Sequence, residues 1–195
     1  LGLRGVRLSL ARAGLLEAQL RALVRASGYG PLRILLPMIS SREEVRAVRA
    51  TLKRVTAQLR EQGHEIAENV PLGAMIEVPA AAIALPTFIG SVAFLSIGTN
   101  DLVQYLLAAD RNNEALTDLY TPLHPAVIRL VSSVIRLAQK RGKPVAVCGE
   151  MAGDPHFAPM LFALGLTEFS LHPATLLELR RTFRHCDHAQ LLARA

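Results

Sequence analysis

Short apolar runs alternate along this chain with longer segments in which apolar residues recur every three or four positions. The apolar runs are short enough for strands and are bounded by Gly, Pro or polar residues. They occupy residues 32–38, 72–78, 92–97, 144–148 and 168–171. Nearly continuous apolar strands separated by helical segments are typical of a parallel sheet that is buried on both faces. The pattern therefore predicts an α/β domain.

The segments between these runs have the periodicity and the end signals of amphipathic helices. Ser41 followed by Glu44 forms a capping box and opens a helix that is expected to stop near Gly63. Its apolar stripe is Val45, Val48, Leu52, Val55 and Leu59. Similar stripes are Leu16, Leu20, Leu23 and Val24 before the first strand, and Val127, Val131, Val134 and Ala138 after Pro125. Further helices are predicted at 80–85, 101–109, 156–164 with Asp154-Pro155 at its start, and 173–184.

Two architectures fit this order of elements, an open doubly wound sheet and a (β/α)8 barrel. No Gly-rich dinucleotide loop follows an early strand, which favours the barrel. Five strands are too few for a closed eight-stranded barrel. Either some strands escape the pattern, or the chain begins after the first ones. Residues 1–195 are interpreted as one α/β domain, or as part of a larger one.

Composition removes several classes of function. Hydrophobic residues make up 51% and charged residues 19% of the chain, which excludes disorder. The absence of a long uninterrupted apolar stretch and of a signal-peptide pattern predicts a cytoplasmic protein with no membrane contact. The net charge of +6 is compatible with nucleic-acid binding, but its Arg residues lie largely on predicted helix faces and aromatics are only 5%. We therefore predict no nucleic-acid partner, and free thiols at Cys148 and Cys186.

Reactive side chains follow three consecutive predicted strands. Glu77 ends the second strand, Asn100 and Asp101 follow the third, and Cys148 ends the fourth. Because functional groups gather at the carboxyl ends of parallel strands, we expect these side chains to lie together. Two carboxylates at adjacent strand ends suit Mg²⁺, which takes its remaining ligands from water and substrate oxygens.

Arginines could complete such a site by holding a phosphate or carboxylate through two parallel hydrogen bonds. Arg4 and Arg111 lie in predicted loops that could face the same rim, whereas Arg33 lies at the start of its strand, a weaker position. The implied substrate is a small polyanion bound together with Mg²⁺.

Each candidate also has a purely structural interpretation, and the spacing alone does not decide between the two. Glu77 could simply pair with an Arg, Asp101 could be a helix N-cap, and Cys148 could be core packing rather than an acid or nucleophile. His124 and His172 both precede Pro at predicted helix starts, which favours local structure over metal binding.

Six ordered segments resemble the signature segments of enzyme I of the bacterial sugar phosphotransferase system, within the family of phosphoenolpyruvate-utilising enzymes. They are LGLRGVRL, LRILLPMIS, MIEVPAAA, FLSIGTNDLVQYLLAADRNNE, LHPAVIRL and VCGEMAGDP, and they span nearly the whole chain. The resemblance implies a (β/α)8 barrel that binds phosphoenolpyruvate with Mg²⁺ at its carboxyl rim. The family usually has DRGN where this chain has 110–113 as DRNN, which leaves the sugar and nitrogen-regulatory branches both open.

The resemblance also implies a role for each residue of the site. Glu77 and Asp101 correspond to the metal ligands and Asn100 to a phosphoryl contact. The residues that correspond to the phosphate-binding arginines are Arg4, Arg33 and Arg111. Cys148 corresponds to the proton donor to the methylene carbon of enolpyruvate.

The whole enzyme implied by the resemblance is a transferase that moves the phosphoryl group of phosphoenolpyruvate to a histidine on a separate domain and then to a small histidine-containing phosphocarrier protein. That histidine domain and the first barrel strands are expected to precede Leu1, so this chain alone is expected to bind phosphoenolpyruvate without completing the transfer. A homodimer is expected. The alternatives are pyruvate phosphate dikinase or phosphoenolpyruvate synthase, a Mg²⁺-dependent lyase or aldolase, and a non-catalytic binding or dimerisation module.

Overall fold

All five predicted strands are present in the computed structural model, which describes residues 1–187 and 189. In the described part of the chain they form one sheet in the order β1-β2-β3-β4-β5, and every neighbouring pair is parallel. The strands are β1 (Ile34–Leu36), β2 (Leu72–Ile76), β3 (Phe94–Gly98), β4 (Val145–Cys148) and β5 (Glu168–Phe169). The predicted α/β class with a parallel sheet is confirmed.

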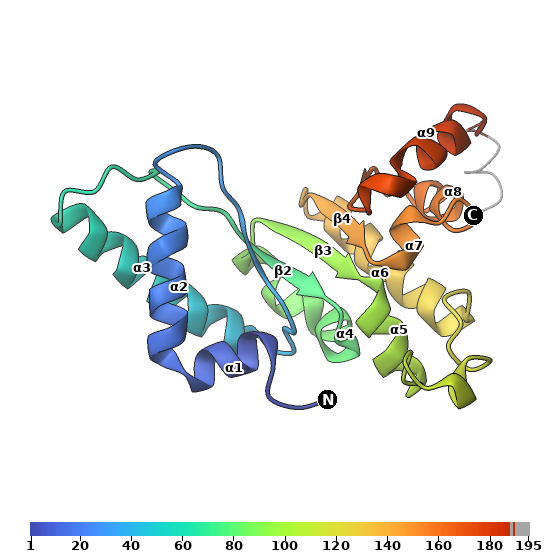
Figure 1. Ribbon diagram of the computed structural model, residues 1–195, viewed down its shortest axis with the longest axis horizontal. Helices are drawn as coiled ribbons and strands as arrows, with labels where there is room; N and C mark the ends of the chain where they lie inside the picture. Colours follow the sequence, from blue (N-terminus) through green and yellow to red (C-terminus); the bar gives the residue numbers. More distant parts are fainter. Residues whose placement is uncertain (188, 190–195) are drawn as a thin grey trace.

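The strand order distinguishes between the two architectures that the sequence left open. Each strand pairs with the next one in the chain, so the direction of winding never reverses as it does in a doubly wound sheet. Because crossovers between parallel strands are right-handed, such an order places successive helices on the same face. Figure 1 shows α4 and α6 together behind β2, β3 and β4. The sheet is thus an arc of barrel type, with β1 and β5 at its edges.

The helices occupy most of the predicted segments. Those that connect the strands are α3 (Arg42–Glu61), α4 (Pro79–Phe88), α5 (Thr99–Leu107), α6 (Pro125–Lys140), α7 (Glu150–Gly153) and α8 (Ala158–Ala163). The flanking helices are α1 (Gly5–Ala11), α2 (Ala13–Ala26) and α9 (Leu176–Arg184). Short 3₁₀ turns are η1 (Ile89–Ser91), η2 (Glu114–Leu116) and η3 (Pro173–Thr175).

The predicted helix faces supply the core. All four stripe residues predicted on α6 are buried, and on α3 only Leu52 stays partly exposed. The capping box of α3 is present, with the Ser41 side chain accepting from the Glu44 N–H and the Glu44 carboxylate accepting from the Ser41 N–H. At about 1.5–3 kcal/mol for each fully buried Val or Leu side chain, these stripes hold α3 and α6 against their neighbours.

Several local features differ from the predictions. The helix predicted over 156–164 is present as α8, but it begins at Ala158, because the Asp154 carboxylate accepts from the His156 N–H and holds 154–157 in a turn. The short helix α7 before this turn was not predicted. Helix α1 was not predicted, since its seven residues are too few to show a stripe. Strand β5 has two residues instead of four, as an edge strand pairs on one side only.

No helix in the described residues is both long enough and apolar enough to cross a membrane.

Candidate functional site

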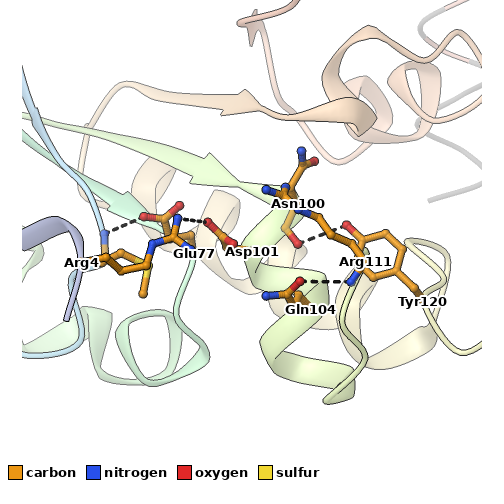
Figure 2. A network of polar contacts seen from close by, with 8 residues as sticks. Arg4, Glu77, Asn100, Asp101, Gln104, Arg111 and Tyr120 are labelled. Carbon is orange, nitrogen blue, oxygen red and sulfur yellow. Dashed lines mark hydrogen bonds and ion pairs between the residues drawn. The ribbon is translucent and has the colours of Figure 1, made fainter. Parts of the chain in front are cut away.

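Two buried carboxylates face each other where β2 and β3 end. Glu77 directly follows β2, and Asp101 lies in the first turn of α5, which begins at once after β3. The two residues are 5% and 8% exposed. Their neighbouring strands are in parallel register from Gly73 and Phe94 to Ile76 and Ile97, so both chain ends arrive at the same edge of the sheet. Figure 2 shows the two side chains side by side.

The contacts of Glu77 exclude the interpretation in which it only pairs with an Arg. The backbone N–H of Met38 donates to Glu77 Oε1 at 2.6 Å. Met38 has a positive φ of 59°, an uncommon conformation for a residue with a side chain, and this turns its N–H toward the carboxylate. Gly98 makes room on the other side, since a Cβ there would lie 2.9 Å from both the Cβ and Oε2 of Glu77.

Asp101 is not the N-cap that the sequence allowed, because Gly98 occupies the cap position of α5. One carboxylate oxygen, Oδ2, accepts from Arg4 Nη2 at 3.3 Å, and the Arg4 side chain is half exposed. The other oxygen, Oδ1, is buried and has no hydrogen-bond partner among the described residues. Arg4 reaches this place because the Val6 N–H donates to Pro37 O, which fixes the start of α1 beside the end of β1.

The electrostatics of the pair favour a cation. Burial raises the pKa of the Glu77 carboxyl above its ordinary value, and the Asp101 carboxylate raises it further, against the opposing effects of the Met38 N–H and Arg4. Two buried carboxylates in this arrangement are relieved by a proton or by a metal ion. The described residues hold no cluster of three or more His, Cys, Asp or Glu ligands. A hard cation that needs only one or two carboxylates, as Mg²⁺ does, fits these residues.

Asn100 lies beside Glu77 and Asp101, and its side-chain amide oxygen already accepts a hydrogen bond. Asn100 Oδ1 accepts from the Glu150 N–H at 2.9 Å, and the Asn100 carbonyl oxygen accepts from the Tyr120 hydroxyl at 3.1 Å. Gly149 allows this packing, since a Cβ there would lie 2.6 Å from Asn100 Oδ1 and its φ of 95° strains any other residue. The side-chain NH₂ of Asn100 is therefore the group left to donate to a ligand.

Arg111 lies in the exposed loop that follows α5. Its backbone N–H donates to Gln104 Oε1 at 3.1 Å, and Tyr120 ties the far end of the same loop to Asn100 (Figure 2). Burial raises the pKa of Tyr120, the carboxylates of Glu150 and Asp101 add to the rise, and Arg111 opposes it. The hydrogen bonds of Arg111 with Gln104 and of Tyr120 with Asn100 tie this loop to α5.

Cys148 occupies the corresponding position on the next strand. It ends β4 opposite Gly98 of β3, and it lines a cavity of about 730 Å³ together with Asn100, Glu150 and His172. Its sulfur accepts from Ser96 Oγ at 3.5 Å and donates to Ile97 O at 3.5 Å. Burial raises the pKa of the Cys148 thiol, and Glu77 adds to the rise while Ser96 opposes it. A thiol that stays protonated suits a proton donor better than a nucleophile.

Arg33 lies apart from these groups in the described structure, and its role in the site stays a prediction. It precedes β1, and its guanidinium lies over the ring of Phe94, 5.5 Å from the centroid. Phe94 begins β3, so this contact is at the amino ends of the strands, at the opposite edge of the sheet from Glu77 and Asp101. The first and last residues of a parallel strand lie at opposite ends of the sheet. The side chain of Arg33 lies at the end where the strands begin.

Several residues of the site were not predicted. Met38, Gln104 and Tyr120 act through backbone or loop contacts that leave no sequence pattern. Ser96 had a signal, since it is the polar residue within an otherwise apolar strand. The local roles predicted for His124 and His172 are confirmed, because each accepts the backbone N–H two residues ahead and caps the turn that begins there.

Comparisons with known proteins concern the chain as a whole. Residues 1–188 match the family described as PEP-utilising enzyme, PEP-binding domain. Phosphoenolpyruvate-protein phosphotransferases from Cupriavidus necator and Priestia megaterium are 48% and 46% identical over 194 and 191 residues. Each alignment covers 98% of this chain and 33% of the relative. The chain thus spans about a third of the length of the curated relatives it matches.

Two solved structures share the fold. A citrate lyase from Burkholderia xenovorans superposes with a TM-score of 0.66 at 24% identity, over 91% of this chain and 58% of that one. An HpcH/HpaI aldolase from Desulfitobacterium hafniense gives 0.52 at 18% identity, over 86% and 70%. At these identities the likeness concerns the barrel-type fold alone.

Proposed function

Since the chain belongs to the family of PEP-binding domains of PEP-utilising enzymes, we propose that it is the phosphoenolpyruvate- and Mg²⁺-binding barrel domain of a phosphoenolpyruvate-protein phosphotransferase. One observation carries the assignment of the site. Glu77 and Asp101 are buried together at the carboxyl edge of the sheet, and one oxygen of Asp101 lacks a partner among the described residues. A bound cation would neutralise the two carboxylates. Such a cation would take its remaining ligands from water and from the oxygens of an anionic substrate.

The groups around the pair suit a phosphorylated enolate. Glu77 and Asp101 would hold Mg²⁺, which when bound neutralises charge on the phosphoryl and enolate oxygens. Arg4, half exposed beside Asp101, and Arg111 on the rim loop supply positive charge for the phosphoryl and carboxylate groups. The NH₂ of Asn100 donates to a phosphoryl oxygen. Positioning and charge neutralisation are what phosphoryl transfer requires most from a protein.

Cys148 completes the chemistry on the pyruvate side. When the phosphoryl group leaves, the enolate must take a proton on its methylene carbon to become pyruvate. In this proposal the half-buried thiol at the end of β4 gives that proton, and its raised pKa keeps the proton available until the enolate forms.

The acceptor of the phosphoryl group lies outside this domain in the proposed reaction. A histidine on another domain attacks phosphorus in line, and the phosphohistidine then passes its group to a small histidine-containing phosphocarrier protein. The 45–48% identity to several phosphotransferases supports this choice over pyruvate phosphate dikinase or phosphoenolpyruvate synthase. The homodimer, the cytoplasmic location and the role in sugar transport stay predictions.

The lyase alternative has the two solved structures in its favour, but only at the level of fold. A lyase acting on a 2-keto-4-hydroxy acid would release pyruvate without any phosphoryl group. We expect no such release from this chain, and its detection would replace the proposal.

Calorimetric titration of the chain with phosphoenolpyruvate, with and without Mg²⁺, tests the proposal. We expect saturable heat only with Mg²⁺, and its loss in Asp101→Asn, which keeps the shape of the side chain but removes its charge. Asp118→Asn in the exposed part of the rim loop is the matched control and should bind as the unaltered chain does. No heat under either condition, or equal affinity in Asp101→Asn, would contradict the site.

A further inference from the structure

Ser96 is a buried hydroxyl in contact with the sulfur of the proton donor. It lies in the middle of β3, is 6% exposed, and has Leu95 and Ile97 as its apolar neighbours in the chain. Placing a hydroxyl in a buried sheet costs free energy unless it finds a partner. Its partner is Cys148, one strand away, at 3.5 Å from Ser96 Oγ to Cys148 Sγ.

The register of the sheet makes this contact specific. Ser96 pairs with Ala146 of β4, and Gly98 pairs with Cys148, so Ser96 reaches diagonally across to a side chain two residues further along the neighbouring strand. Residues two apart on a strand share one face, so Ser96 and Cys148 lie on the same face of the sheet. The thiol in turn donates to Ile97 O at 3.5 Å, so the sulfur is held both as an acceptor and as a donor.

We propose that Ser96 is a positioning residue for proton transfer, which orients the Cys148 thiol and donates a hydrogen bond to the thiolate that forms when Cys148 gives up its proton. The inference rests on the proposed function, and it names the group that supports the proton donor of that site.

The proton step shows where Ser96 acts. The S–H bond of Cys148 breaks and its electron pair stays on sulfur, while the enolate π pair forms the new C–H bond and the C2–O bond becomes the carbonyl of pyruvate. The sulfur changes from a neutral thiol to an anion in a half-buried place, and the Ser96 O–H is the donor already directed at it. Hydrogen bonds to charged groups are stronger than those to neutral ones, so Ser96 favours the charged state over the neutral one.

Solvent exchange of the pyruvate methyl protons isolates this step, because it runs through the enolate without needing a phosphoryl acceptor. The exchange is followed by NMR in D₂O with Mg²⁺ and pyruvate, using the whole chain. We expect Ser96→Ala to lower the maximal exchange rate about tenfold, the effect of losing one hydrogen bond to an anion. The pyruvate concentration for half-maximal exchange should not change. Ser96→Thr keeps the hydroxyl on a strand-forming residue and should recover the rate.

Ser133→Ala is the matched control. Ser133 donates its hydroxyl hydrogen bond to Leu130 O on the surface of α6, away from the thiol, and its removal should leave exchange unchanged. A second readout needs no substrate, since the rate of Cys148 alkylation by iodoacetamide follows the thiolate population. Mass spectrometry separates the modified Cys148 from Cys186. Ser96→Ala should slow alkylation of Cys148 about tenfold at fixed pH, by the same lost hydrogen bond.

The outcomes separate the inference from the proposed function. Exchange by the unaltered chain at a rate that Ser96→Ala does not reduce would overturn the role of Ser96 and leave the proposed function standing. A raised half-saturation concentration with an unchanged maximal rate would also overturn it, since that result describes substrate binding. No exchange by the unaltered chain would overturn the proposed function, and the inference with it.

Discussion

Gly98→Ala is the substitution that tests most directly whether the geometry around Glu77 matters. A methyl group at position 98 would lie 2.9 Å from the Cβ and from Oε2 of Glu77, and 3.1 Å from Met75 Sδ. The Glu77 Cβ is fixed by the backbone and cannot move aside as the end of a long side chain can. The end of β2 or β3 must therefore shift, and the Glu77 carboxylate must leave its present position.

The cost can be worked from this contact. Overpacking by one methyl group costs about 1–3 kcal/mol, while Gly→Ala recovers about 0.4–1 kcal/mol by restricting the unfolded chain. The net loss lies between about 0 and 2.6 kcal/mol, which corresponds to a melting temperature lower by up to about 10 °C for a chain of this size. Displacing a metal-binding carboxylate should weaken Mg²⁺-dependent phosphoenolpyruvate binding at least about tenfold.

Gly90→Ala is the control for Gly98→Ala. Gly90 lies in the exposed turn η1, and a Cβ there would meet no atom within 4 Å. Gly90→Ala lowers the conformational entropy of the unfolded chain as Gly98→Ala does, but it creates no close contact. It should therefore be neutral or slightly stabilising and should bind ligand normally. Thermal unfolding and calorimetry of both variants give the comparison. Equal affinity for phosphoenolpyruvate in Gly98→Ala and Gly90→Ala would refute the reasoning about Glu77.

Three further outcomes are expected. Cys148→Ala should bind phosphoenolpyruvate within about twofold of normal yet lose proton exchange into pyruvate by at least about 10²-fold; normal exchange would return Cys148 to a packing role. Burial raises the pKa of the Cys148 thiol above its ordinary value of 9.0, so the thiol stays protonated to a higher pH. The rate of Cys148 alkylation should therefore reach half its maximum only above pH 9.0. A midpoint below that value would contradict the effect of burial. Arg33→Ala should leave ligand affinity unchanged and cost about 0.5–1 kcal/mol of stability, from the lost contact with Phe94; a loss of affinity would restore Arg33 to the site.

The candidate site is assembled from the carboxyl ends of three neighbouring strands. Glu77 follows β2, Asp101 follows β3 and Cys148 ends β4, and these three strands are adjacent in the described sheet. Each strand delivers one side chain to the same edge, although the outermost two residues are 71 positions apart in the sequence (148 − 77). A shift of register by one residue in β4 would turn Cys148 to the other face of the sheet.

The sequence by itself determined the strands, the buried helix stripes and most of the residues at the carboxyl edge. These follow from periodicity, capping and the position of polar residues at strand ends, which are local properties that the chain carries wherever it folds. Ser41 and Glu44, His124 and His172 have the local contacts that their neighbours in sequence predict.

Only the tertiary structure decided between the interpretations that the spacing left open. Asp101 is not an N-cap, because α5 already begins at Thr99. Which side chains surround Asp101 leaves one of its oxygens without a hydrogen-bond partner among the described residues. Arg33 is turned to the amino edge by Phe94, a residue 61 positions later (94 − 33). Ser96 and Cys148 meet through strand register. Contacts of this kind depend on how distant segments pack, and packing is not a property of any one segment.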